Sequence, residues 1–267
     1  MSGASGLELR GLVRRGEFAL AVDFAVASGE IVALSGPNGV GKTTVLRYLA
    51  GLGGSLSAVP EVPAGAAAGG ATDRAASGTA GGATGASGTE PCYLLDGRNM
   101  RSVPTDRRGF GVVFQEPRLV AHMTAIDNVA FAATLGGVRK SEARARAAEL
   151  LGELGLPAAK HSLKPQSLSG GQRGRVAIAR ALAVPSPRLR LFDEPLAAID
   201  APSRPLLRSV LAAHLAESSA PTLLVTHDPA DVRALATRDI PLGRSGEVGE
   251  IGEIGETQEI GEAGETD

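Results

Sequence analysis

The 267-residue sequence contains no tryptophan, one cysteine and only 3% aromatic residues. A single cysteine excludes an internal disulfide and is typical of proteins in a reducing cytoplasm. No apolar run approaches the roughly 20 residues that a membrane helix needs, and the N-terminus lacks the charged-then-apolar pattern of a signal peptide. The four histidines are too scattered to indicate a metal cluster. With 43% hydrophobic residues, the sequence instead predicts a globular chain with a sizeable core.

Charge and composition divide the chain unevenly. Of the 37 residues in 53–89, 29 are alanine, glycine, serine or threonine. Such residues bury too little surface to offset their ordering entropy, so we expect a flexible, dispensable insert at 53–90 within a folded domain of residues 1–245. Residues 246–267 carry seven glutamates and one aspartate without a base, which predicts a disordered acidic Gly-Glu tail. The body is only mildly basic, too weakly to indicate nucleic-acid binding.

The most specific motif is the glycine-rich run GPNGVGKTT at residues 36–44. It matches G-x-x-x-x-G-K-[ST], the phosphate-binding P-loop, and lies between an apolar strand pattern at 31–34 and a helical pattern at 42–52. Backbone N–H groups and the positive end of the helix dipole attract a polyphosphate there. Lys42 would reach the β- and γ-phosphates, and the Thr43 hydroxyl would ligate Mg²⁺. The predicted nucleotide-binding residues are Gly36, Pro37, Asn38, Gly39, Val40, Gly41, Lys42, Thr43 and Thr44.

Two carboxylates follow a second apolar segment, residues 189–192. Asp193 at the end of this predicted strand is placed to hold Mg²⁺ through its water shell. Glu194 would then face the γ-phosphate and polarise the attacking water. An acidic turn after a strand is common, and the P-loop in the same chain is what favours the catalytic interpretation.

A third motif, LSGGQ at residues 168–172, precedes a strongly helical run. Ser169 is predicted as the N-cap of that helix, and Gly170 and Gly171 would let a phosphate approach the backbone closely. With Gln172 they form a second candidate anion site at a helix N-terminus. An ordinary capped helix is the alternative.

In this order, the P-loop, LSGGQ and apolar-DE segments resemble the ATP-binding subunit of an ABC transporter. VVFQ at 112–115, AAID at 197–200 and LLVTHD at 223–228 are similar to the Q-loop, D-loop and switch strand of that family. The resemblance extends from about residue 7 to about residue 243. It implies an α/β P-loop NTPase fold with a mostly parallel core sheet, an antiparallel β-subdomain and a helical subdomain at 124–156.

The resemblance gives four more residues a role, and three of them also fit a structural one. Gln115 would contact Mg²⁺ or water through its neutral amide, or simply cap a strand. His227 would donate a hydrogen bond to the γ-phosphate, although a lone histidine at a strand end is more often structural. Phe18 stands where the family stacks an aromatic ring on adenine, and a core aromatic fits equally well. Asp200 would couple two sites across an interface.

The resemblance also implies cofactors and partners. ATP and Mg²⁺ would bind between two copies of the domain, with LSGGQ of one copy against the γ-phosphate of the other. The homodimer would be peripheral, on the cytoplasmic face of the membrane, where it would drive separate permease subunits and, indirectly, a solute-binding protein. EPLAAID at 194–200 and the segment 14–51 look most like molybdate importers. Importers of sulfate or polyamines share much of this, and we expect no extra C-terminal β-domain.

Three alternatives remain open on the sequence. A P-loop kinase or GTPase is disfavoured because the NKxD motif is absent and LSGGQ has no role in either. A soluble ABC ATPase without a transport role usually carries two such domains or a long coiled-coil insert. A non-catalytic binding protein is opposed by the intact Lys42, Glu194 and His227.

Overall fold

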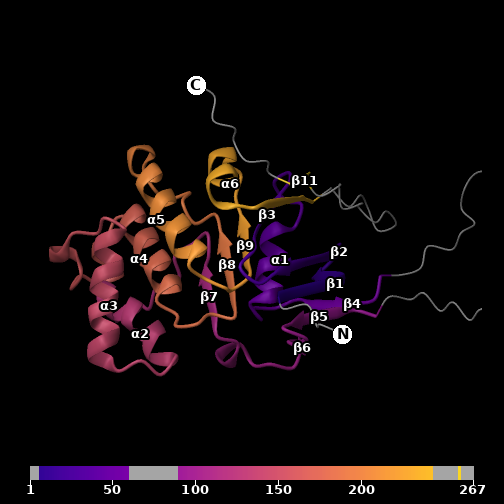
Figure 1. The fold of residues 1–267 in the computed structure, drawn as a ribbon, viewed down its shortest axis with the longest axis horizontal. Helices are drawn as coiled ribbons and strands as arrows, with labels where there is room; N and C mark the ends of the chain where they lie inside the picture. The colour runs from indigo at the N-terminus through magenta and orange to yellow at the C-terminus, as the bar shows by residue number, and fades with distance from the viewer. Residues whose placement is uncertain (1–5, 60–89, 243–257, 260–267) are drawn as a thin grey trace, which may run out of the picture.

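The computed structural model describes residues 6–59, 90–242 and 258–259, and Figure 1 shows their arrangement. A mixed sheet with helices around it occupies the centre, an antiparallel sheet lies on one side and a group of helices on the other. The predicted α/β fold of the ABC type is confirmed. Most of the insert and most of the predicted acidic tail lie outside the described residues. Within the tail, Gln258–Glu259 form a short strand, where disorder was predicted. No helix among the described residues has the length and apolar character to cross a membrane.

The central sheet has the strand order β11-β10-β3-β9-β8-β7. Its strands are β3 (Ile31–Ser35), β7 (Phe110–Val113), β8 (Leu189–Asp193), β9 (Thr222–Val225), β10 (Arg238–Pro241) and β11 (Gln258–Glu259). All neighbouring pairs are parallel except β10 with β11. Pro241, which lacks an N–H, is the last residue of β10, so it costs the ladder little. Burial of β8 and β9 along their whole length explains why both are mostly apolar.

The antiparallel sheet has the order β2-β1-β5-β6, with β4 also paired to β1. Its strands are β1 (Gly6–Arg15), β2 (Phe18–Ala27), β4 (Ser55–Ser57), β5 (Cys92–Leu95) and β6 (Arg98–Asn99). The prediction of an insert without core contacts from residue 53 was wrong at its beginning. Leu56 pairs with Val13 and is 5% exposed, so one apolar residue anchors the start of this small-residue stretch to the sheet.

Helices flank both sheets. They are α1 (Lys42–Leu49), α2 (Ala125–Leu135), α3 (Lys140–Glu153), α4 (Gly170–Leu182), α5 (Arg204–Ala216) and α6 (Pro229–Leu235), with short 3-10 turns at 105–107, 158–160, 165–167 and 201–203. The first helix ends at Leu49 rather than residue 52, because Gly51 adopts a left-handed conformation with φ 78°. α2, α3 and α4 pack together through a core that includes Val129, Leu150 and Ile178. α2 and α3 lie in the predicted helical subdomain at 124–156, and α4 packs against them from outside that range.

Candidate nucleotide-binding site

The parallel strands β3, β7, β8 and β9 bring four predicted segments to one edge of the sheet. The chain leaves the carboxyl ends of these strands into the P-loop, Gln115, Glu194 and His227 respectively. In open α/β sheets, ligands bind outside the carboxyl ends of the strands. A cavity of about 280 Å³ opens there, lined by Phe18, Asn38, Gly39, Gly41, Lys42, Thr43, Thr44, Gln115, Glu194 and Val225.

Lys42 lies inside the P-loop and is 7% exposed. Its Nζ donates to the carbonyl oxygens of Gly36 at 2.6 Å and Pro37 at 3.0 Å. Gly39 and Gly41 have φ of 83° and 107°, a conformation that L side chains rarely adopt. The Phe18 ring packs directly on Gly41, where an added Cβ would come within 2.5 Å of its Cζ. The ring therefore lines the cavity and packs on the loop.

Asp193 ends β8 and faces the start of α1. Its Oδ1 accepts a hydrogen bond of 3.0 Å from the Thr43 hydroxyl, and the residue is 1% exposed. Burial raises the pKa of Asp193, against the opposing effect of the Thr43 hydrogen bond. A buried carboxylate beside a threonine hydroxyl is an oxygen donor pair of the kind Mg²⁺ prefers. Two of the three residues predicted as metal ligands thus lie together, and the third, Gln115, lines the same cavity.

Glu194 and His227 form the second polar pair of the edge. His227 Nδ1 lies 2.8 Å from Glu194 Oε1, a hydrogen bond in which the nitrogen donates to the ionised carboxylate. The His227 side chain is 69% exposed, whereas that of Glu194 is 13% exposed. The backbone of Glu194 has φ 51°, and its N–H donates to Val225. A left-handed conformation costs a non-glycine residue of the order of 1–3 kcal/mol and is typical of functional sites.

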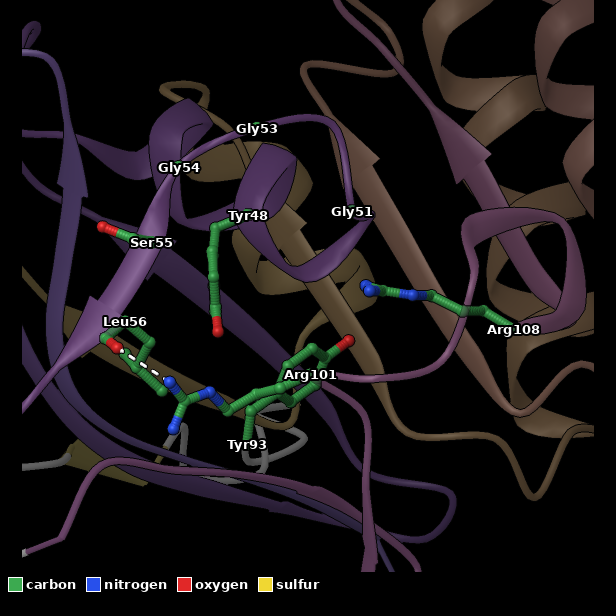
Figure 2. Close-up of a pocket in the computed structure, with 9 residues that line it drawn as sticks. All are labelled: Tyr48, Gly51, Gly53, Gly54, Ser55, Leu56, Tyr93, Arg101 and Arg108. Carbon is green, nitrogen blue, oxygen red and sulfur yellow. Dashed lines mark hydrogen bonds between the residues drawn. The ribbon is translucent and has the colours of Figure 1, made fainter.

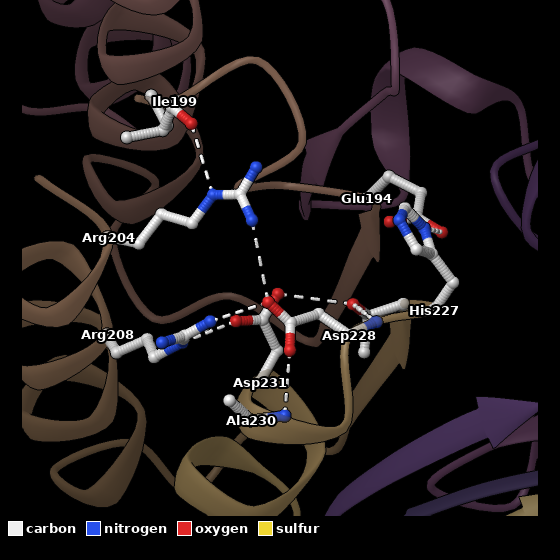
Figure 3. Close-up of polar contacts among 9 residues, drawn as sticks. Glu194, Ile199, Arg204, Arg208, His227, Asp228, Ala230 and Asp231 are labelled. Carbon is white, nitrogen blue, oxygen red and sulfur yellow. Dashed lines mark hydrogen bonds and ion pairs between the residues drawn. The ribbon is translucent and has the colours of Figure 1, made fainter. Parts of the chain in front are cut away.

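The sequence interpretation missed a network that fixes the chain beside His227, shown in Figure 3. From α5, Arg208 donates to Asp228 at 2.7 Å and to Asp231 at 2.5 Å, and Arg204 lies 3.6 Å from Asp228. The Asp228 carboxylate also accepts from the Ala230 N–H as the N-cap of α6, and these bonds lower its pKa. The one signal in the sequence was the Asp-Pro pair at a helix start.

The LSGGQ residues are not brought to this cavity. Ser169 is exposed and begins α4 with a capping box, in which Ser169 and Gln172 exchange hydrogen bonds of 3.0 and 3.2 Å. The predicted N-cap is confirmed. Gly171 and Gly174 lie against the loop after β8, and a Cβ at Gly174 would come within 3.3 Å of Ile199.

A comparison with models of protein families agrees with the arrangement of these residues at the sheet edge and with the order of the motifs. A model described as ABC transporter matches residues 20–197. This chain belongs to the ABC transporter family. Within that family, the present cassette resembles import proteins and solved ATP-binding cassettes.

Three curated relatives of the cassette illustrate this. Sulfate/thiosulfate import ATP-binding protein CysA of Mycobacterium tuberculosis (strain ATCC 25618 / H37Rv) is 39% identical over 81% of this chain and 52% of its own. Fe(3+) ions import ATP-binding protein FbpC of Mesorhizobium japonicum is 36% identical over 88% and 57%. Spermidine/putrescine import ATP-binding protein PotA of Nitrosomonas europaea is 36% identical over 87% and 55%. The chain spans about half the length of these relatives.

Among solved structures, two dimeric structures of the ATP-binding cassette MJ0796, one of them a post-hydrolysis state bound to ADP and Pi, superpose with a TM-score of 0.71. They are 26% identical to this chain and cover 96% of it and 99% of their own length. The cassette therefore has the fold of ATP-hydrolysing ABC cassettes, and import ATP-binding proteins are its relatives.

Proposed function

We propose that this chain hydrolyses ATP with Mg²⁺ and that two copies form the complete sites. One copy would supply the P-loop, Asp193, Glu194, Gln115 and His227. The other would supply the LSGGQ residues, with Asp200 at the interface. The observation that carries this proposal is the split arrangement: a cavity at the sheet edge with its phosphate loop and carboxylates, and an exposed second anion motif outside it.

The hydrolytic step follows from the pair at the sheet edge. Glu194, placed next to the predicted Mg²⁺ ligand Asp193, would orient and deprotonate the attacking water. His227, hydrogen-bonded to Glu194 at 2.8 Å, would hold that carboxylate in place. In its imidazolium form, which has two N–H donors, it would also donate to the γ-phosphate through Nε2. Mg²⁺ supplies charge neutralisation on the phosphates when bound.

The biological role we propose is that of a peripheral subunit on the cytoplasmic face of the membrane, driving import through permease subunits served by a solute-binding protein. The opening and D-loop segments favour molybdate as the solute, and the sulfate/thiosulfate relative supports a small oxyanion. Uptake of labelled molybdate and labelled sulfate by cells with and without the intact gene tests this. Equal uptake of both labels in the two strains would contradict an oxyanion role.

The Glu194→Gln variant tests the catalytic proposal. Glutamine keeps the shape but is a far poorer base, so hydrolysis should fall by about 10²–10⁴-fold while ATP affinity stays near the parental value. Size-exclusion chromatography with ATP and Mg²⁺ should show an accumulated dimer. Glu142→Gln, on the exposed side of α3, is the matched control and should behave like the parent. Parental turnover by Glu194→Gln would rule out its role as base.

A further inference from the structure

A second cavity, of about 330 Å³, lies at the opposite end of α1 from the P-loop (Figure 2). Lys42 begins this helix in the nucleotide cavity, and Tyr48, near its end, lines the second one. Lys42 and Tyr48 are separated by roughly 9 Å along the helix, at about 1.5 Å a residue. The remaining walls come from residues 51–56 and from Tyr93, Arg101 and Arg108.

The lining of this cavity is positively charged. Among the described residues, its two charged side chains are both arginines, Arg101 and Arg108, and no carboxylate lines it. Both guanidinium groups act on the Tyr48 hydroxyl, lowering its pKa against the larger effect of burial, which raises it. Figure 2 shows Tyr48 and Arg108 pointing toward the same space. Hydrogen-bond donors and positive charge thus converge there.

The existing contacts of these groups leave that charge uncompensated. Arg108 is 7% exposed and donates to the carbonyls of Leu49 at 2.6 Å and Val103 at 3.0 Å. Arg101 donates to the Leu56 carbonyl at 3.3 Å. These acceptors are neutral, and within the described ranges neither arginine has an ion-pair partner. Arg101 is exposed, whereas Arg108 is buried. Burying the Arg108 charge without an opposite charge is costly, so an anion beside it in the cavity would be stabilised.

The carboxyl end of α1 opposes an anion because it is the negative pole of the helix. Here the carbonyl oxygen of Leu49, the last residue of α1, is already hydrogen-bonded. It accepts from the Tyr93 hydroxyl at 2.7 Å and from the Arg108 guanidinium. The Tyr48 hydroxyl accepts or donates no hydrogen bond among the described residues, so it is available to a ligand. Two guanidinium groups and a free hydroxyl outweigh the helix pole.

We propose that this cavity binds an oxyanion, a sulfate or phosphate group, through Arg101, Arg108 and the Tyr48 hydroxyl. Charge-assisted hydrogen bonds from guanidinium groups are the strong ones for such groups. The volume falls within the range of small-ligand pockets and exceeds a bare oxyanion. The group is therefore either inorganic or the head of a small organic phosphate. This site is separate from nucleotide binding and does not depend on it.

The sequence supplies its own reporter for this site. The chain has two tyrosines and no tryptophan, and both tyrosines, Tyr48 and Tyr93, line the cavity. Tyrosine fluorescence of the full chain therefore reports on this cavity alone. The P-loop is first filled with Mg²⁺ and a non-hydrolysable ATP analogue, and sodium sulfate is then titrated against sodium chloride of equal ionic strength. We expect a saturable change with sulfate and none with chloride.

Arg101→Gln and Tyr48→Phe should weaken sulfate binding, Arg101→Gln by at least about tenfold, since a hydrogen bond to a charged group is worth that factor or more. Arg98→Gln, an exposed arginine in β6 outside the cavity, is the matched control and should bind like the parent. Unchanged binding of the ATP analogue shows that each variant is folded.

A parallel titration with glycerol 3-phosphate distinguishes the two sources. Tighter binding than inorganic phosphate would assign an organic phosphate, and equal binding the inorganic ion; either supports the proposal. The oxyanion proposal is overturned if sulfate and chloride give the same change in tyrosine fluorescence. It is also overturned if Arg98→Gln weakens sulfate binding as much as Arg101→Gln.

Discussion

The nucleotide cavity and the LSGGQ end of α4 are both predicted to hold phosphate, yet they are built differently. In the cavity, Lys42 and Asp193 are almost fully buried and already hydrogen-bonded by their own chain. At α4, Ser169 is exposed and its hydroxyl only caps its own helix. In the proposed function, the first region would bind a nucleotide alone, whereas the second has no walls of its own. A buried loop and an exposed cap suit a site completed between two molecules.

The largest effect should come from breaking the buried region. Lys42→Ala removes charge-assisted hydrogen bonds to two phosphates, each worth about 1.5–3 kcal/mol, so ATP affinity should fall by roughly 10²–10⁴-fold. Isothermal titration calorimetry measures this directly. Lys140→Ala, at the exposed start of α3, should leave affinity unchanged, and parental affinity in Lys42→Ala would mean that the P-loop does not hold the phosphates.

A substitution at the exposed LSGGQ end of α4 should affect dimer formation rather than ATP affinity. Ser169→Arg, added to Glu194→Gln, should dissolve the ATP-dependent dimer, because the larger cation replaces a small hydroxyl at the predicted γ-phosphate contact. The ATP affinity of the monomer should stay within about twofold of the parental value. Such a change is far smaller than the tenfold change that corresponds to about 1.4 kcal/mol. Size-exclusion chromatography and calorimetry separate the two effects. Ser167→Arg, two residues earlier and also exposed, should keep the dimer.

A smaller effect concerns the amino half of the strand that carries Asp193. Arg190 is 6% exposed, and its Nε and Nη1 are buried without a hydrogen-bond partner among the described residues; burial lowers its pKa. Unsatisfied buried donors cost about 1–3 kcal/mol each. Arg190→Leu should therefore raise the free energy of unfolding by about that amount in urea denaturation. A loss of stability would mean that an anion or water compensates the guanidinium in solution.

The smallest effect is a pH dependence. The pKa of Asp193 is raised in the folded chain above its ordinary 3.8, so its ionisation opposes folding and stability falls as pH rises through the folded value. Asp193→Asn keeps an acceptor for Thr43 and lacks the charge. Without nucleotide it should melt higher than the parent at pH 7, and the difference should vanish below pH 3.8. Melting curves across this range would contradict the account if the parent were the more stable at pH 7.

Local patterns predicted much of the fold and the site. The apolar strands at 31–34 and 189–192, the helix after Lys42 and the cap at Ser169 all depend on neighbouring residues, and the structure contains each of them. The parallel direction of the central strands agrees with these elements, because strands joined by a crossover helix in one sheet run parallel.

What the sequence could not predict depends on distant residues. Leu56 lies in a stretch of small residues whose average composition hides one buried contact with Val13. Arg208 meets Asp231 from 23 positions away. Arg190, the second residue of the buried strand β8, contradicts the usual exposure of arginine. No periodicity in the sequence indicates where its side chain lies.

The carbonyl contacts of Lys42 have a consequence for selectivity. An ammonium group has three donors, and the free P-loop already occupies two of them with the oxygens of Gly36 and Pro37. A ligand that binds Lys42 must therefore replace these two hydrogen bonds, because the ammonium group is not free. A small stray ion loses as much as a nucleotide in this exchange and regains less, because it offers fewer contacts to the rest of the cavity. In the proposed function, the loop would thereby favour a nucleotide over a small free anion.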